Sequence, residues 1–296
     1  MTRSLISALL LGLCLAFPAR AIETITTADP SGTYITTAPN PPNWNTDWPT
    51  PGTTGSDYVG QVNGSGAVYL GNGWVLTAGH VAPMTTSSPL TFLLDGNTYT
   101  SATGTVTSII TSTGTVDLSL FQISAPPSLA SLKLTLNAPA YFANTNSASQ
   151  VVMLGYGGSS PDQSWGENTA DFEQQIAVTT GGISYVSNDI ITVLGTVSNG
   201  STLSTNTAYV VGGDSGGGDF IFDPTNNTWT LAGINEVDGT DTLSGSTVQI
   251  SGMVQLSDYA TQIQDITGIE VVPEPSTWAL LGLGLVFLWR RSRLRR

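Results

Sequence analysis

Short apolar runs separated by Gly, Asn and Asp fill most of this chain, and their length predicts β-strands rather than helices. Residues 67–70 and 74–77 flank Gly71-Asn72-Gly73, which predicts a β-hairpin. A second hairpin is expected around Asp95-Gly96-Asn97. The same pattern predicts further strands at residues 105–110, 118–123, 151–154, 190–194, 208–211, 220–222 and 229–234.

Helical spacing occurs only late in the sequence. Tyr259, Ile263 and Ile266 repeat at helical intervals, and Ser257 or Asp258 can cap the start of that helix. Residues 125–148 interrupt the strand pattern and indicate a crossing between two halves. The sequence therefore predicts a mostly β fold with one short C-terminal helix, consistent with two packed β-barrels.

The N-terminal end differs from this body. Arg3 precedes an apolar run at residues 5–16, and Ala19-Arg20-Ala21 has the small-x-small pattern of a cleavage site. These features predict a secretory signal peptide over residues 1–21, cleaved before Ile22. Cys14 is the only cysteine of the chain and lies within this signal, so the processed protein is expected to have no disulfide.

Residues 22–55 are rich in Thr, Pro, Asn and Ser, and this composition predicts an extended segment. The pattern is compatible with a pro-segment and with a strap that crosses the body. It does not distinguish the two.

The C-terminal end, residues 272–296, combines three features. Pro273-Glu274-Pro275 precedes a 12-residue apolar run at residues 278–289, and arginines follow it. At about 1.5 Å per residue this run is short for a hydrocarbon core of about 30 Å, and the arginines predict that this end stays cytoplasmic. The order resembles the PEP-CTERM sorting signal of Gram-negative bacteria, which implies a transient membrane anchor removed by an exosortase. An ordinary C-terminal anchor is the alternative.

The charge of the body is strongly acidic. The chain has 21 Asp and Glu against 8 Lys and Arg, and Lys133 is the only basic residue between the two ends. Such a surface repels nucleic acid and anionic membranes, so neither is an expected partner.

Three residues could supply the chemistry of a serine nucleophile. A serine hydroxyl needs a base that takes its proton, and that base needs a carboxylate that fixes its tautomer. His80 is the only histidine and follows an apolar strand; Ser215 lies in Gly213-Asp214-Ser215-Gly216-Gly217; Asp117 begins another apolar strand. The alternatives are a glycine-rich surface loop around Ser215 and a solvated turn at Asp117.

These stretches resemble the trypsin/chymotrypsin-like serine peptidases. The family carries Trp-Val-Leu-Thr-Ala-x-His, here residues 74–80, and Gly-Asp-Ser-Gly-Gly, here residues 213–217. The resemblance implies two packed six-stranded β-barrels over residues 56–271 and an acyl-enzyme mechanism. It implies that His80, Asp117 and Ser215 are catalytic and that the backbone N–H groups of Gly213 and Ser215 form an oxyanion hole.

Chain order argues against two other hydrolase classes. The α/β-hydrolases place their catalytic histidine after the serine, and in this chain no histidine follows Ser215. The subtilisins have the order Asp, His, Ser, which Asp57 would complete here. Subtilisins are α/β proteins, however, and the sequence between the two ends of this chain lacks their helices.

The chain departs from the family at several positions. The family's usual cysteines are absent. Animal relatives pair a freed N-terminal amine with the aspartate before the serine, here Asp214, and signal cleavage would supply Ile22 for that pairing.

Two departures concern substrate binding. Glu236 and Val237 occupy the positions of Trp and Gly in the Ser-Trp-Gly segment that the family usually has. Tyr209 replaces the acidic pocket residue of trypsin-like members, so an Arg or Lys preference does not follow, although Glu236 or Asp238 could supply negative charge.

The expected function is therefore a secreted serine endopeptidase in the envelope or outside a Gram-negative cell. It needs no metal or cofactor, acts on a peptide or protein, and has Tyr209 and Glu236 as substrate-binding candidates. A turn is expected at Asp238-Gly239-Thr240-Asp241 rather than a calcium site. The alternative function is a non-catalytic surface or matrix binding protein on the same fold, and an esterase is a third.

Overall fold

The computed structural model describes residues 22–24, 33–144, 148–157, 162–194, 207–224, 226–243, 245–269 and 271–272. The predicted signal peptide and nearly all of the predicted sorting signal lie outside these residues. Within them the chain is mostly β-strand with one short α-helix, as the sequence predicts.

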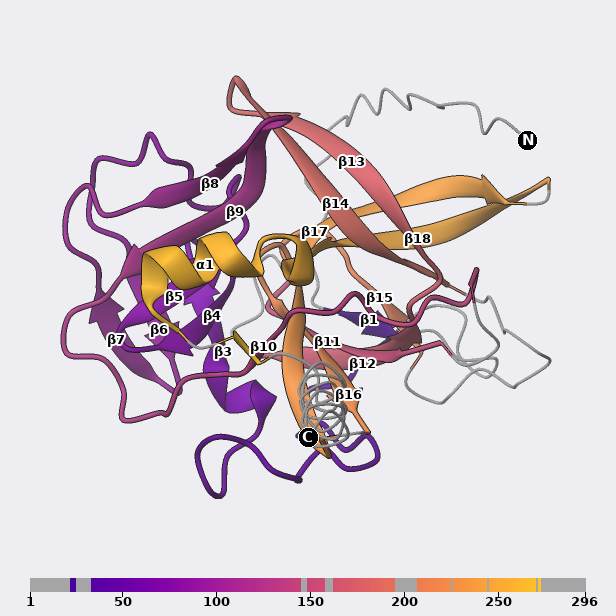
Figure 1. Ribbon diagram of the computed structural model, residues 1–296, viewed down its shortest axis with the longest axis horizontal. Helices are drawn as coiled ribbons and strands as arrows, with labels where there is room; N and C mark the ends of the chain where they lie inside the picture. The colour runs from indigo at the N-terminus through magenta and orange to yellow at the C-terminus, as the bar shows by residue number, and fades with distance from the viewer. Residues whose placement is uncertain are drawn as a thin grey trace, which may run out of the picture.

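The strands form two successive groups (Figure 1). The first group is antiparallel and runs in the order β9-β5-β4-β3-β6-β7, with β8 on the other side of β9. A single bridge between Ser101 and Ile123 brings the end of β7 back to β9. Its members are β3 (Val59–Val62), β4 (Ser65–Gly71), β5 (Trp74–Thr77), β6 (Thr91–Leu94), β7 (Asn97–Thr100), β8 (Thr107–Thr111) and β9 (Gly114–Gln122).

The second group is also antiparallel and runs in the order β12-β11-β16-β17-β18-β14, with β13 beyond β14. A parallel pairing of Tyr185 on β14 with Thr115 on β9 joins it to the first group. Together with the short strands β10 (Leu134–Thr135) and β19 (Val271–Val272), hydrogen bonding links both groups into one sixteen-stranded sheet, and the division into two six-stranded barrels stays a prediction. Its members are β11 (Gln150–Gly155), β12 (Ser164–Thr169), β13 (Phe172–Thr180), β14 (Ile183–Val193), β16 (Gly218–Asp223), β17 (Thr228–Leu243) and β18 (Ser246–Gln255).

Short elements complete the described fold. A small sheet has the order β15-β1-β2. The 3₁₀ turn η3 leads into α1, which ends at Gly268 in the left-handed conformation that glycine adopts without strain. These elements are β1 (Glu23–Thr24), β2 (Thr33–Tyr34), η1 (Gly55–Tyr58), β10 (Leu134–Thr135), β15 (Ala208–Tyr209), η3 (Leu256–Asp258), α1 (Ala260–Thr267) and β19 (Val271–Val272).

Both predicted hairpins are confirmed. β4 and β5 pair across Gly71-Asn72-Gly73, and β6 and β7 pair across Asp95-Gly96. Asn72 and Asp95 have positive φ angles of 52° and 47°, which Asn and Asp tolerate better than other side chains.

The largest hydrophobic core holds residues of both strand groups and of α1. It also includes Trp44 and Trp48 from the Thr- and Pro-rich N-terminal segment. This part of the segment is therefore packed as a strap on the body. A smaller core contains Ile22 together with Val151, Ile190 and Val210.

Candidate active site

His80 is placed by the tight turn that follows β5. Its backbone N–H donates to Asp117 Oδ1 at 2.7 Å, and its Nδ1 lies 2.6 Å from Asp117 Oδ2. The turn requires glycine at position 79, since a Cβ there would lie 2.9 Å from both Asp117 Oδ1 and the Tyr185 ring. The backbone and the ring of His80 are thus both fixed by one carboxylate.

Asp117 lies in β9 and is fully buried, whereas the His80 side chain is 21% exposed. Its own backbone N–H donates to the Ser187 hydroxyl at 3.1 Å. Tyr185 donates its hydroxyl to the Gly79 carbonyl at 3.1 Å and so connects β14 to the histidine turn. A buried carboxylate needs polar partners, and here the two donors come from His80.

Ser215 lies in a turn between β15 and β16 that is held by backbone bonds. Gly217 donates to the Asp214 carbonyl at 2.9 Å, and Gly66 of β4 donates to the Ser215 carbonyl at 2.8 Å. Gly216 has a φ of 84°, and a Cβ there would lie 2.1 Å from the Gly66 carbonyl oxygen. The turn therefore depends on glycine both for its conformation and for its approach to β4.

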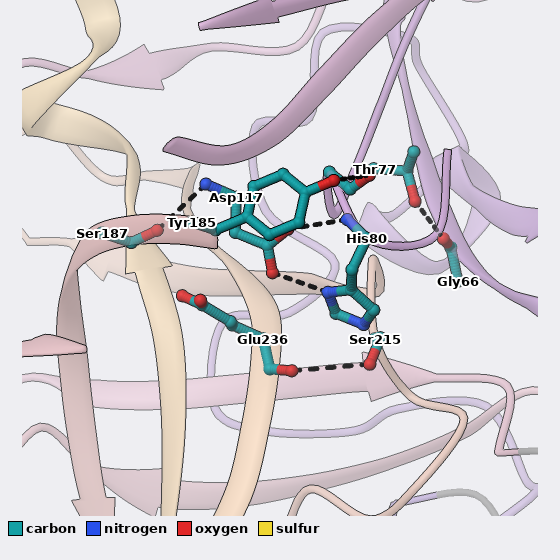
Figure 2. Close-up of polar contacts among 9 residues, drawn as sticks. Gly66, Thr77, His80, Asp117, Tyr185, Ser187, Ser215 and Glu236 are labelled. Atoms are coloured by element: carbon teal, nitrogen blue, oxygen red, sulfur yellow. Dashed lines mark hydrogen bonds and ion pairs between the residues drawn. The ribbon is translucent and has the colours of Figure 1, made fainter. Parts of the chain in front are cut away.

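The three predicted catalytic residues come together from three separate segments. Figure 2 shows the His80 ring between the side chains of Asp117 and Ser215. The Ser215 hydroxyl donates to the Glu236 carbonyl at 3.5 Å, which is a long contact. With Nδ1 bonded to Asp117, Nε2 is the nitrogen left to face the serine.

The backbone N–H groups of Gly213 and Ser215 are the predicted donors of an oxyanion hole. Within the described residues no acceptor takes either N–H group. Gly213 has a φ of 101°, a conformation that favours glycine. Both donors are thus free for an external oxygen.

Asp214, next to the serine, is buried, and no cation of the described residues pairs with it. Its Oδ2 accepts the Val211 N–H at 2.9 Å, the Ile22 backbone also bonds to its carboxyl group, and Oδ1 has no partner. Burial raises the pKa of Asp214 well above its ordinary value, against the smaller effect of the two backbone bonds. Gly155 makes room for it, because a Cβ at Gly155 would lie 2.1 Å from Oδ1.

The two substrate-binding candidates are placed differently. Tyr209 is half-buried in β15 and donates its hydroxyl to Glu23 Oε2 at 2.9 Å. The Glu236 side chain is buried and only 3% exposed, and its carboxyl group points toward Asp117 rather than outward (Figure 2). Only the backbone of Glu236 faces the serine, and a substrate-binding role for Glu236 stays a prediction. Tyr209 stays a prediction.

Sequence reasoning missed two residues beside this site, Ser187 and Asp189. Both lie on β14, and both are fully buried. The alternation of Tyr185, Ser187 and Asp189 along one face of a strand is visible in the sequence. That this face turns toward Asp117 depends on the pairing of β14 with β9, which no local pattern reveals.

In the part of the chain that the structure describes, no three His, Cys, Asp or Glu side chains are arranged to hold a metal ion. The described residues also contain no helix with the length and apolar character needed to cross a membrane. The predicted membrane helix lies in the sorting signal, outside those residues.

The chain belongs to the trypsin-like peptidase domain family, whose model matches residues 64–233, more than half of the sequence. A second family model, the PEP-CTERM protein-sorting motif, matches residues 271–293. This motif indicates an exported protein that an exosortase recognises and processes at its C-terminus. A search of curated proteins gave no match.

Among solved structures, an inactive form of the Rv3671c protease is 16% identical, with 72% of this chain and 90% of that chain covered and a TM-score of 0.45. The NS6 protease from murine norovirus 1 is 17% identical, with 68% and 91% covered and a TM-score of 0.40. The passenger domain of plasmid encoded toxin from enteroaggregative Escherichia coli is 16% identical, with 67% and 21% covered and a TM-score of 0.38. These similarities are weak, so the family assignment rests on the sequence match.

Proposed function

We propose that this protein is an exported serine endopeptidase that hydrolyses peptide bonds through an acyl-enzyme on Ser215. Membership in the trypsin-like peptidase family supports a peptide or protein substrate. One observation carries the finer assignment. The carboxylate of Asp117 bonds Nδ1 of His80 at 2.6 Å, so the opposite ring nitrogen is presented to a serine on a glycine turn.

In the proposed first step, Nε2 of His80 takes the proton of the Ser215 hydroxyl while Oγ attacks the carbonyl carbon of the substrate. The carbonyl oxygen becomes an oxyanion and binds the free N–H groups of Gly213 and Ser215. His80 then returns the proton to the leaving amine, and the peptide bond breaks. Asp117 stays ionised throughout and stabilises the imidazolium.

In the second step, water replaces the leaving amine. His80 takes a proton from this water, whose oxygen attacks the ester carbon. The tetrahedral intermediate collapses, the proton returns to Ser215 Oγ, and the acid product leaves. Each step uses the same three side chains and the same two backbone donors.

Serine is favoured over cysteine as the nucleophile because of the composition of the chain. Cys14 is the only cysteine and lies in the predicted signal peptide. The processed protein then has no thiol that could serve. The tail at residues 272–296 is proposed as a transient anchor, with its arginines on the cytoplasmic side until an exosortase removes it.

The test uses a chain from Ile22 to Pro275 and a fluorophosphonate probe, which reacts with activated serines. We expect labelling of this chain and none after Ser215→Ala or His80→Ala. Cleavage of a denatured protein substrate, compared with hydrolysis of a small ester, separates a peptidase from an esterase. Absence of labelling together with tight, turnover-free binding of envelope polysaccharide would replace the proposal with the non-catalytic alternative.

A further inference from the structure

Glu236 occupies a β-bulge in the strand that borders the serine. Along β17 and β18, Asn235 pairs with Met253 and Val237 pairs with Gly252, so Glu236 is the extra residue between them. A bulge redirects the groups of the extra residue. Here it directs the Glu236 carbonyl to Ser215, while the carboxyl group enters the interior toward Asp117 (Figure 2).

A second carboxyl group meets Glu236 in that interior. Asp189 of β14 is 0% exposed, and its carboxyl group lies close enough to that of Glu236 for the two groups to interact. Space for it is made by the glycine at position 252, where a Cβ would lie 2.7 Å from Asp189 Oδ2. The bulge and this glycine thus allow the two acids to approach each other in the interior.

No positive charge in the described part of the chain compensates the two acids. Among the described residues, no backbone N–H group and no cation bonds to any of their four carboxyl oxygens. Two buried carboxyl groups in contact cannot both be ionised at low cost, so at least one proton stays between them. Burial raises the pKa of Asp189 to about 8 and that of Glu236 well above its ordinary value.

Ser187 connects the pair to the catalytic residues. Its hydroxyl accepts the backbone N–H of Asp117 at 3.1 Å, and the same side chain lies beside the Glu236 carboxyl group and favours the charged form of that group. The negative charge of Asp117 acts in the opposite direction and raises the pKa of both acids. Asp117, in turn, bonds His80, so the charge state of the pair and that of the imidazole are coupled.

The other titratable groups around the pair are acids and phenols. Asp219 of β16 interacts with Asp189, Tyr141 lies near Asp189 from the segment after β10, and Tyr259 lies near both acids from the turn before α1. None of them supplies a cation. The proton is therefore held by the two carboxyl groups themselves.

We propose that Asp189 and Glu236 form a proton-sharing positioning pair behind Asp117, which sets the charge around His80 during the reaction. This inference rests on the proposed function only in its kinetic consequence. Loss of the shared proton adds one negative charge near an imidazole that becomes positive in the transition state. Because opposite charges attract in a poorly solvated site, that loss makes the transition state more accessible.

The first test needs no activity, because His80 is the only histidine and gives a single set of imidazole NMR signals. The exported protein carrying Ser215→Ala, purified without a histidine tag, is titrated from pH 5 to pH 10. Beside any inflection of its own, the imidazole should report a second inflection near pH 8 that comes from the pair. The double variant Asp189→Asn/Glu236→Gln should lose the second inflection.

The single variants and a matched control sharpen this test. Asp189→Asn or Glu236→Gln should move the second inflection to lower pH, since an amide N–H stabilises the remaining carboxylate. Asp219→Asn removes another buried acid that no interaction ties to Asp117, and it should keep the second inflection. A folded double variant that retains this inflection, or a parent protein that lacks it, would overturn the pairing.

The kinetic test uses the active protein and a neutral fluorogenic peptide. Between pH 7 and pH 9 we expect kcat/KM to rise roughly three- to tenfold, as one nearby charge can cause, and to stay level in the double variant. Equal profiles in the two proteins would overturn the charge-setting role. Absence of any hydrolysis or fluorophosphonate labelling would refute the proposed peptidase instead, while the NMR result on the pair would still hold.

Discussion

The backbone of Ile22 bonds to the buried carboxyl group of Asp214, the residue directly before Ser215. Ile22 is itself fully buried and is the first residue after the predicted signal cleavage site. Cleavage before Ile22 would convert its backbone amide nitrogen into an ammonium group. The carboxylate of Asp214 would then gain the cation that it lacks in the described residues.

This relationship predicts that signal removal and activation are one event. A chain that begins at Ile22 should react with a fluorophosphonate at least about tenfold faster than one that begins at Ala21. The reason is that removing one partner of a buried ion pair costs several kcal/mol. The rates are measured by quenched labelling. Asp214→Asn in the Ile22 chain should slow labelling to a similar degree, and equal rates in all three chains would contradict the idea.

The same ion pair predicts a pH limit. Pairing raises the pKa of the Ile22 amine above its usual value near 8, so the charged form persists into moderately alkaline solution and is lost above the raised pKa. Labelling of the Ile22 chain should fall in that range, whereas a chain beginning at Ala21 should show no such fall. A pH profile of labelling rates for both chains checks this.

Asp117→Asn tests the role of the carboxylate in orienting His80. Asparagine fits the same space but favours the wrong imidazole tautomer, so we expect kcat to fall roughly 10³- to 10⁴-fold with little change in KM. The backbone bond from His80 to position 117 can still form with the amide oxygen. A fall of less than tenfold, with thermal stability retained, would show that Asp117 does not serve the histidine.

The buried acids predict that this protein becomes less stable as pH rises. Burial raises the pKa of Asp189, Asp219 and Glu236, so the folded state binds more protons than the unfolded state between about pH 4 and the raised values. The contribution of these groups to the free energy of unfolding is then largest below about pH 4. It declines as pH rises toward 8 and beyond.

Asp219→Asn isolates one of these contributions. Neither carboxyl oxygen of Asp219 has a partner, and the residue is fully buried. The variant should raise the melting temperature at pH 8 by about 2–4 °C and change it less at pH 5, because ionisation of the unfolded-state acid favours unfolding less strongly at pH 5 than at pH 8. Calorimetry of the Ser215→Ala protein at both pH values measures the difference. An equal effect at the two pH values would contradict a titration origin.

The sequence was informative wherever a local rule decides the structure. Glycine and asparagine defined the hairpin after β4, and the glycines around Ser215 marked a turn that only glycine can form. The bulge at Glu236 could not be predicted in this way. It depends on the register of β17 against β18, and the burial of Asp189 depends on β14 crossing to β9, a contact between distant segments.

The N-terminal segment shows the same limit, since its composition left a pro-segment and a strap equally open. Trp44 is 1% exposed, and its ring centroid lies 5.0 Å from that of Trp48 and 4.9 Å from that of Trp229. The Trp229 indole N–H donates to the Asn43 carbonyl at 2.9 Å. These contacts join the segment to β17, the strand that carries Glu236.

A packed strap predicts that residues 22–55 stabilise the enzyme and do not inhibit it. Trp44→Ala should lower the free energy of unfolding by about 3–5 kcal/mol, because it removes a large buried side chain and leaves a cavity. Asn45→Ala, at an exposed neighbouring position, is the matched control and should change it by less than about 0.5 kcal/mol. Urea denaturation measures both. A chain that starts at Asp57 should expose Phe220 and Trp229 and label more slowly, whereas faster labelling would identify the segment as an inhibitory pro-segment.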